Sequence, residues 1–334
     1  MIEDSLLSSE QIISLMHDEY GLDINEVEKI DRGSANLYLL NKDEYILKEF
    51  QSKYTPEEIL KEIKIIDHLR EKNIPVPEYM PTKSGNKFIT VMGKVVIVQR
   101  YIKGYTIKQN EGNYEQVIES AREYGKMIKS LDTLDVDLPY QDALSWLTLE
   151  KMNKSINKYK TLINDLKEGK YYSRIKSDLE DKIQMLEHIK DNYDFSNINN
   201  LTIKNTHGDY SLQQFIYEDG KIKAIIDFAS ACKMPIVWEL IRSYSYIDKE
   251  FDLNNFKDYV EEFMKYVPLT DDDIKYMPYI YLVQLLNSDY GYKQYIYDDR
   301  KEELLLFGFY RTKLCKYLFE NALVISNELT KKHF

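Results

Sequence analysis

The sequence lacks several features that would place a protein in a broad class. Its 334 residues include only two cysteines, Cys232 and Cys315, which form no spaced motif and fit a reducing, cytoplasmic compartment. No stretch approaches the ~18 continuous apolar residues of a membrane span, and no signal peptide is expected at the N-terminus. Acidic residues outnumber basic ones by 56 to 45, and the net charge of −11 argues against a nucleic-acid partner.

What is present is a globular composition, with 43% hydrophobic and 30% charged residues. A chain of this length usually folds as two domains or one bilobal unit. Hydrophobic spacing predicts strands at 27–30, 37–40, 45–50, 87–91 and 94–101, with capped helices at 8–20 and 55–72. Farther along the chain, hydrophobic spacing predicts helices at 114–131, within 146–192 and within 251–330. The chain is therefore predicted to divide into residues 1–102 and residues 103–334.

One predicted β-hairpin interrupts the helical part. The apolar runs 215–217 and 222–228 are joined by the turn Glu218-Asp219-Gly220. Asp209 precedes the first run within a polar loop, and Asp227 lies near the end of the second. Such a hairpin would hold both acids near one mouth of a sheet. One carboxylate in that position can accept a proton from a hydroxyl, and the other can hold a divalent cation.

The hairpin resembles the catalytic hairpin of the aminoglycoside phosphotransferase superfamily, which includes choline kinases, type II homoserine kinases and spore-coat relatives. The similar residues are His207-Gly208-Asp209, Gln214 and Ile226-Asp227-Phe228. The resemblance implies an α+β, bilobal, protein-kinase-like fold with a small antiparallel-sheet N-terminal lobe and a larger, mostly helical C-terminal lobe. It implies Asp209 as catalytic base and Asp227 as a ligand of Mg²⁺. Gln214 would be a second metal ligand, where the family usually has Asn.

Each piece of the hairpin also has an ordinary interpretation. His207 would then be a core histidine, Asp209 a loop acid and Asp227 a strand-end cap. We favour the catalytic interpretation because the residues occur together, in this order and at this spacing.

The resemblance extends to a nucleotide-binding segment in residues 1–102. The stretch from Gly33 to Tyr38 is similar to a degenerate phosphate-covering loop, which implies that Gly33, Ser34 and Asn36 contact nucleotide phosphates. A simple hairpin turn is the alternative interpretation.

A lysine and a backbone segment complete the implied nucleotide site. Lys48 would contact the α- and β-phosphates and be held by Glu62, with Glu58 as the second choice of partner. A solvated strand lysine is the alternative. The main chain around Gln99, Tyr101 and Ile102 would receive the purine edge.

The implied activity is transfer of the γ-phosphoryl group of ATP or GTP to a hydroxyl of a small molecule. Acids and tyrosines between Asp271 and Glu303 favour a cationic acceptor such as an aminoglycoside, while a core aromatic stripe with a solvated acidic face is the alternative. Two other functions stay open. One is a metabolic kinase for homoserine, choline or a sugar. The other is a weak or inactive kinase-like protein, because Gln214 and Ala229 replace residues common in the family.

Overall fold

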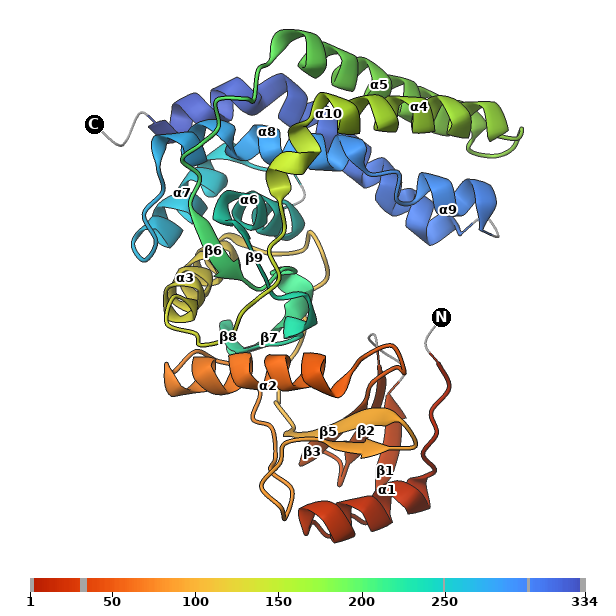
Figure 1. Cartoon of the computed structure of the whole chain (residues 1–334), viewed down its shortest axis with the longest axis vertical. Helices are drawn as coiled ribbons and strands as arrows, with labels where there is room; N and C mark the ends of the chain where they lie inside the picture. Colours follow the sequence, from red (N-terminus) through yellow and green to blue (C-terminus); the bar gives the residue numbers. More distant parts are fainter. Residues whose placement is uncertain (1–2, 31–34, 249, 299–300, 331–334) are drawn as a thin grey trace. The chain divides into compact units, whose positions relative to one another are not determined.

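An antiparallel sheet lies in the N-terminal part of the computed structural model, which describes residues 3–30, 35–248, 250–298 and 301–330. In spatial order its strands are β1 (Val27–Ile30), β2 (Asn36–Leu40), β3 (Tyr45–Glu49), β5 (Lys94–Arg100) and β4 (Ile89–Val91) (Figure 1). All neighbouring strands run antiparallel. The strands expected from the sequence are present here, and their ends differ from the expected ones by one or two residues.

One face of this sheet is covered by the helical segment that precedes it. α1 (Ser9–Leu15) begins at a capping box formed by Ser8 and Gln11, and it continues as the π-helical turn η1 (Met16–Tyr20). The apolar side chains of Ile12 and Met16 pack with buried residues of β2, β3 and β5. Removal of this apolar surface from water joins the segment to the sheet.

The helix α2 (Pro56–Glu71) carries a charged residue within its buried stripe. It begins at the predicted capping box of Thr55 and Glu58, with Pro56 at its first position. Ile59, Ile63, Ile65, Ile66 and Leu69 form the buried apolar stripe, and Glu62 lies among them. α2 packs against α3 (Tyr114–Leu131) and the short helix η4 (Phe228–Ser230). This packing places Glu62 within the same compact unit as the predicted catalytic hairpin.

The first described residues, Glu3–Leu7, form a segment that we call the N-terminal strap. Its contacts include two buried charged residues of the sheet, Glu49 and Lys94. The backbone N–H of Leu6 donates to Glu49 Oε1 at 3.0 Å, and Lys94 Nζ donates to the carbonyl of Asp4 at 2.8 Å. Lys94 Nζ also lies 3.6 Å from Glu49 Oε1. The buried ion pair therefore fastens the strap to the ends of β3 and β5.

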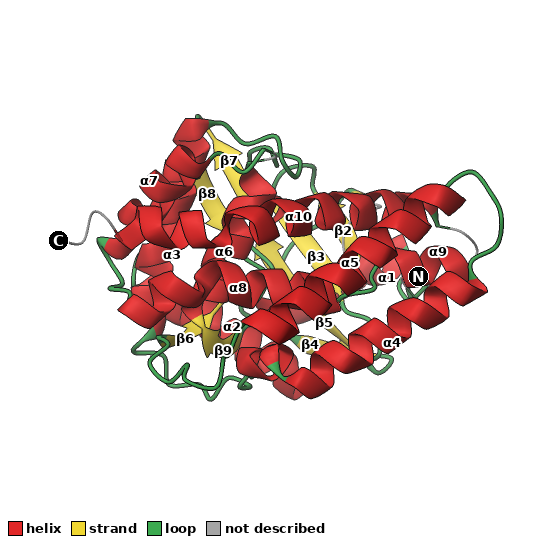
Figure 2. Cartoon of the chain, turned by 90° about the horizontal axis from the view of Figure 1, so that it is seen from above, coloured by secondary structure: helices red, strands yellow, loops and turns green. Residues whose placement is uncertain are grey.

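Helices form most of the remaining chain (Figure 2). They are α3, η2 (Ala143–Leu147), α4 (Leu149–Asp165), α5 (Tyr172–Asn192), α6 (Ile236–Ile247), α7 (Leu253–Met264), α8 (Asp271–Asn287), α9 (Tyr292–Tyr297) and α10 (Glu302–Thr330). Two short strand pairs accompany them: β6 (Ile203–Thr206) with β9 (Cys232–Pro235), and β7 (Phe215–Glu218) with β8 (Lys221–Ile225). Within the described ranges, no helix is long and apolar enough to cross a bilayer.

Contacts divide the chain into two compact units. The first comprises Met1–Pro139, Asn205–Cys232 and Ser243–Val267, and the second comprises Tyr140–Lys204, Lys233–Arg242 and Pro268–Phe334. The described residues predicted for catalysis, metal binding and nucleotide binding all fall within the first unit, and the predicted acceptor region lies in the second. The predicted lobe boundary after residue 102 is a different division of the chain, and it stays a prediction.

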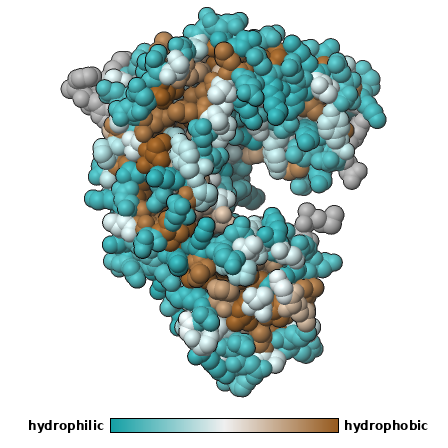
Figure 3. All heavy atoms as spheres, in the orientation of Figure 1, coloured by the Kyte–Doolittle hydropathy of each residue, from teal (hydrophilic) through white to brown (hydrophobic). Residues whose placement is uncertain are grey.

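In the second unit, Lys182 of α5 is a buried lysine that lies against the C-terminal end of α8. Its Nζ donates to the carbonyls of Leu285 and Ser288, at 2.9 and 2.7 Å. Burial lowers the pKa of Lys182 to about 8. A cation thus lies against carbonyls at the end of a helix, where it complements the helix dipole. The outer surface of α4 and α5, by contrast, is mostly hydrophilic (Figure 3).

Several residues of the acidic, tyrosine-rich region between residues 271 and 303 have side chains that bond to other parts of the second unit. Asp273 is fully buried and accepts a 2.9 Å hydrogen bond from the backbone N–H of Thr202. Asp289 lies 3.3 Å from Lys158. The buried hydroxyl of Tyr292 donates to Asp178 at 3.0 Å. These three residues fit the core interpretation, and an acceptor site formed by other residues of this region stays a prediction.

Candidate active site

The loop that carries Asp209 is bonded directly to the residue before Asp227. The ring Nε2 of His207 lies 3.0 Å from the carbonyl of Ile226, and the N–H of Ile226 donates to the carbonyl of Gln214 at 2.9 Å. Both main-chain groups of Ile226 are therefore held by the 207–214 segment. The pairing of β7 with β8 continues this connection, since Phe215 faces Ile225. The structure thus brings Asp209 and Asp227 to the same end of the hairpin.

His207 holds this loop in place. Its ring is fully buried and packs against Phe228, with ring centroids 4.5 Å apart. The backbone N–H of Asp209 donates to His207 Nδ1 at 3.2 Å. Because Nδ1 accepts, the proton of the neutral ring must be on Nε2, which donates to Ile226. His207 is therefore a buried histidine, as the ordinary interpretation proposed for it, and its two hydrogen bonds position the candidate catalytic residues.

Two positions in the site have left-handed backbone conformations. Gly208 has φ +81°, and a Cβ there would lie 1.9 Å from the carbonyl oxygen of Ser230. Only glycine allows this approach between the Asp209 loop and η4. Asp227 has φ 67° and ψ 65°, a conformation that is uncommon for a residue other than glycine. Such backbone strain is concentrated at functional sites, where it fixes the direction of a side chain.

Gln214 is hydrogen-bonded to the candidate base. Its Nε2 donates to Asp209 Oδ2 at 3.0 Å. A carboxylate only accepts hydrogen bonds when ionised, so the amide must present its nitrogen to Asp209 and keep Oε1 for another partner. The Asp227 carboxylate and the Gln214 Oε1 are hard oxygen donors that suit Mg²⁺. In the described part of the chain, no group of three or more His, Cys, Asp or Glu gathers as a metal site.

Lys48 and Glu62 lie in the first unit, but the structure does not bring them into contact. Lys48 is on β3, and its Nζ lies 4.4 Å from the ring centroid of Phe50. Glu62 is 3% exposed and accepts a 2.8 Å hydrogen bond from the hydroxyl of Tyr79. No ion pair between Lys48 and Glu62 occurs among the described residues, and their pairing stays a prediction. The second choice, Glu58, accepts from the N-cap Thr55 N–H at 2.8 Å.

Tyr79 is a residue of this site that the sequence does not indicate. It is 4% exposed, and its main chain forms an antiparallel bridge with Gln99. Burial raises the pKa of its hydroxyl well above the usual range, and the negative charges of Glu62 and Asp227 add to this shift. Tyr79 therefore stays a neutral donor. Its place two residues after Pro77 gives no sign of its partner, because that partner is on the preceding helix.

Some main-chain groups of the predicted purine-binding segment already bond to other residues. Gln99 faces Ile46 in the sheet and Tyr79 on its other side. The N–H of Tyr101 donates to the carbonyl of Glu44 at 2.9 Å. The main-chain groups of Ile102 and the carbonyl of Tyr101 have no partner within the ranges that the structure describes. Of the three predicted residues, these two could therefore offer main-chain groups to a purine edge.

The predicted phosphate-covering loop lies partly outside the described residues. Gly33 and Ser34 are among those outside. Asn36 is the first residue of β2, is 4% exposed, and donates from Nδ2 to the carbonyl of Glu3 at 3.0 Å. Its side chain therefore holds the N-terminal strap beside the end of this loop.

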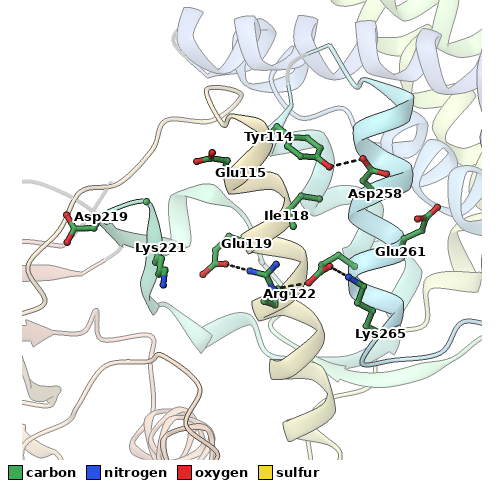
Figure 4. A pocket seen from close by; sticks show the side chains of 12 residues that line it. Tyr114, Glu115, Ile118, Glu119, Arg122, Asp219, Lys221, Asp258, Glu261 and Lys265 are labelled. Carbon is green, nitrogen blue, oxygen red and sulfur yellow. Dashed lines mark hydrogen bonds and ion pairs between the residues drawn. The ribbon is translucent and has the colours of Figure 1, made fainter.

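A cavity of about 610 Å³ lies at the other end of the β7–β8 hairpin, beside the turn at Asp219–Lys221 (Figure 4). α3, α7 and this turn supply its lining. Arg122 bridges Glu119 and Glu262 there, at 2.8 and 2.9 Å. Since the turn is opposite the strand ends that carry Asp209 and Asp227, this cavity is separate from the candidate active site.

Comparison with known proteins assigns the family. Residues 26–264 match the profile of APH, the phosphotransferase enzyme family. The chain belongs to this family. The match begins just before β1 and ends at the last residue of α7, so it includes all the candidate residues above.

Individual relatives agree with this assignment. The homoserine kinase of Zymomonas mobilis is 25% identical over 225 residues, which are 66% of this chain and 64% of that protein. The chain therefore matches slightly less than two thirds of the length of this curated relative. Crystal structures of similar fold include spectinomycin phosphotransferase APH(9)-Ia in complex with ADP and spectinomycin. Its TM-score is 0.65 at 13% identity, and the match covers 98% of this chain and 100% of that one.

A second similar structure is an aminoglycoside phosphotransferase from Alicyclobacillus acidocaldarius. Its TM-score is 0.67 at 13% identity, with 98% of each chain covered. At this identity the likeness establishes the fold alone. The predicted α+β, protein-kinase-like fold class is confirmed, with a small antiparallel sheet and a mostly helical remainder.

Proposed function

We propose that this phosphotransferase is a small-molecule kinase that moves the γ-phosphoryl group of ATP or GTP to a hydroxyl. The observation that carries the proposal is the pair of hydrogen bonds through which the Asp209 loop holds Ile226 and hence positions Asp227. When two carboxylates are fixed at one end of a hairpin, one can act on the acceptor hydroxyl and the other can bind the metal. A related fold was solved with ADP, which supports a nucleotide as co-substrate.

In this mechanism Asp209 orients the acceptor hydroxyl and takes its proton. The hydrogen bond from Gln214 Nε2 to Asp209 Oδ2 fixes the orientation of that carboxylate. Asp227 and Gln214 Oε1 would hold Mg²⁺, which supplies charge neutralisation at the phosphates. Lys48 would bind the α- and β-phosphates, and the main chain of Ile102 would bind the purine. Positioning and charge stabilisation supply most of the rate in such a reaction.

We expect the acceptor to be an alcohol that also carries an amine. The names of two relatives, a homoserine kinase and a spectinomycin phosphotransferase, both refer to such compounds. A protein with a net charge of −11 attracts cations at long range, which also favours a cationic acceptor. Homoserine and aminoglycosides are therefore the first acceptors to test, followed by choline and simple sugars.

The test is a coupled assay for release of ADP or GDP, run with both nucleotides against these acceptors. Asp209→Asn should lower acceptor-stimulated turnover by about 10³-fold, within the usual range for loss of a general base, while calorimetry shows unchanged nucleotide binding. Asp219→Asn, at the exposed turn of the same hairpin, is the matched control. Full turnover in Asp209→Asn would remove Asp209 from its role. Nucleotide binding without turnover on any acceptor would favour an inactive kinase-like protein.

A further inference from the structure

Glu62 is a buried carboxylate with only one of its two oxygens satisfied. It lies in the apolar stripe of α2, where Oε1 accepts from Tyr79 and Oε2 is buried without a hydrogen-bond partner in the described residues. A buried carboxylate is costly unless it is hydrogen-bonded and paired with a cation. Among the described residues, the hydroxyl of Tyr79 is the one polar side-chain partner of this carboxylate, and no cation pairs with it.

Lys48 is the cation that the resemblance to the phosphotransferase superfamily assigns to Glu62, and the proposed function places Lys48 at the phosphates. Its ammonium group now lies over the ring of Phe50, at 4.4 Å from the centroid. A cation–π contact at a partly exposed position is weak, so it can be exchanged for an ion pair at little cost. Because Tyr79 binds Oε1, Oε2 is the oxygen of Glu62 that stays available for Lys48.

Tyr79 is itself held rigidly. Its main chain is bridged to Gln99 on β5, the N–H of the next residue, Met80, donates to the carbonyl of Val98 at 2.8 Å, and the side chain is almost fully buried. The hydroxyl therefore has a fixed position relative to the strand that precedes the predicted purine-binding segment.

We propose that Tyr79 is a positioning residue that sets nucleotide affinity by holding Glu62 for Lys48. This inference rests on the proposed function, in which Lys48 binds the phosphates. Tyr79 touches neither nucleotide nor acceptor. It acts through Glu62, so its loss weakens a contact made equally in the ground state and the transition state. Such a contact changes KM and leaves kcat almost unchanged.

The variant Tyr79→Phe removes the hydroxyl and keeps the ring. We expect about a tenfold rise in both the KM and the calorimetric Kd for the Mg²⁺–nucleotide complex, with kcat changed by less than about twofold. A tenfold effect is the size expected for one hydrogen bond to a charged group. Tyr20→Phe is the matched control, because Tyr20 is also a buried tyrosine of the first unit and its hydroxyl has no partner in the described residues.

A double variant distinguishes a positioning role of Tyr79 from an effect on packing alone. Glu62→Ala removes the residue through which Tyr79 is proposed to act. Adding Tyr79→Phe to Glu62→Ala should then change the nucleotide Kd by less than about twofold. An equal effect of Tyr79→Phe in both backgrounds, or an effect no larger than that of Tyr20→Phe, would overturn the proposal.

These measurements also distinguish failure of the inference from failure of the proposed function. Nucleotide Kd is measured without any acceptor, so it tests Tyr79 even if no acceptor supports turnover. Asp209→Asn tests the phosphoryl transfer and leaves the Tyr79–Glu62 contact intact. If the wild-type protein binds neither ATP nor GTP, both the proposed function and the role of Tyr79 are rejected.

Discussion

Replacing Gly208 by alanine should disable the candidate active site through a steric clash in the main chain. Gly208 and Gly220 have nearly the same backbone conformation, with φ +81° and +76°. They differ in their surroundings. A Cβ at position 208 would lie 1.9 Å from the carbonyl oxygen of Ser230, whereas a Cβ at position 220 would have no heavy atom within 4 Å. Gly220→Ala is therefore a control that isolates the cost of the conformation.

The expected magnitudes follow from this difference. An alanine in the left-handed region costs about 1–2 kcal/mol, which both variants incur. Real Cβ atoms essentially never come closer than 3.0 Å to another heavy atom, so in Gly208→Ala the Ser230 carbonyl must move by 3.0 − 1.9 = 1.1 Å. Overpacking of this kind adds about 1–3 kcal/mol to the loss of stability. Because Ser230 follows Asp227 by three residues, the move separates the two carboxylates. Misplacement by about 1 Å can lower activity 10²-fold.

The assay measures unfolding by urea and acceptor-stimulated nucleotide turnover for both variants. Gly208→Ala should lose about 2–5 kcal/mol of stability and at least about 100-fold in kcat/KM. Gly220→Ala should lose about 1–2 kcal/mol and keep activity within about threefold. If Gly208→Ala is as stable and as active as Gly220→Ala, the contact between the Asp209 loop and η4 does not position the site.

Three further predictions concern the metal, a buried lysine and the strap. Asp227→Ala should abolish the effect of Mg²⁺ on nucleotide affinity, as measured by calorimetry with and without a chelator. The pKa of Lys182 is lowered to about 8 by burial, so the unfolded chain binds more protons between pH 8 and 10.5. Stability should therefore rise by about 3 kcal/mol over that interval in the wild type, and this rise should be absent in Lys182→Met. Lys94→Met leaves Glu49 buried without its cation and should cost about 3 kcal/mol in urea unfolding, whereas the exposed Lys61→Met should cost little.

Local elements were predictable because their signals are contiguous in the sequence. The capping box of Thr55 and Glu58 marks the start of α2, and the observed helix, Pro56–Glu71, lies within the predicted range. The hairpin turn at Glu218–Gly220 likewise identified β7 and β8, although β8 ends at Ile225, before Asp227. At this point the backbone turns into the left-handed conformation of Asp227, which no periodicity in the sequence indicates.

Contacts between distant residues could not be predicted in the same way. Glu62 accepts a hydrogen bond from Tyr79, 17 positions away on a loop, whereas the resemblance implied Lys48 as its partner. The outcome depends on packing between α2 and the 75–80 segment, because that packing determines which side chain reaches the buried carboxylate. His207 is a similar case. Its presence in the motif was evident, but its role in bonding Ile226 depends on the fold of the hairpin.

The N-terminal strap has a consequence for the order in which the protein is made. The backbone of the strap is held by Lys94, which follows its partner Asp4 by 90 residues. At a synthesis rate of roughly 5–20 residues per second, Lys94 is added to the chain about 5–18 s after Asp4. During this interval the strap lacks its hydrogen bond from Lys94, so it is held by fewer contacts and is more open to proteases and chaperones. Ribosome-bound chains that stop before β5 should therefore be cleaved within the strap, and chains that have released the complete sheet should be protected there.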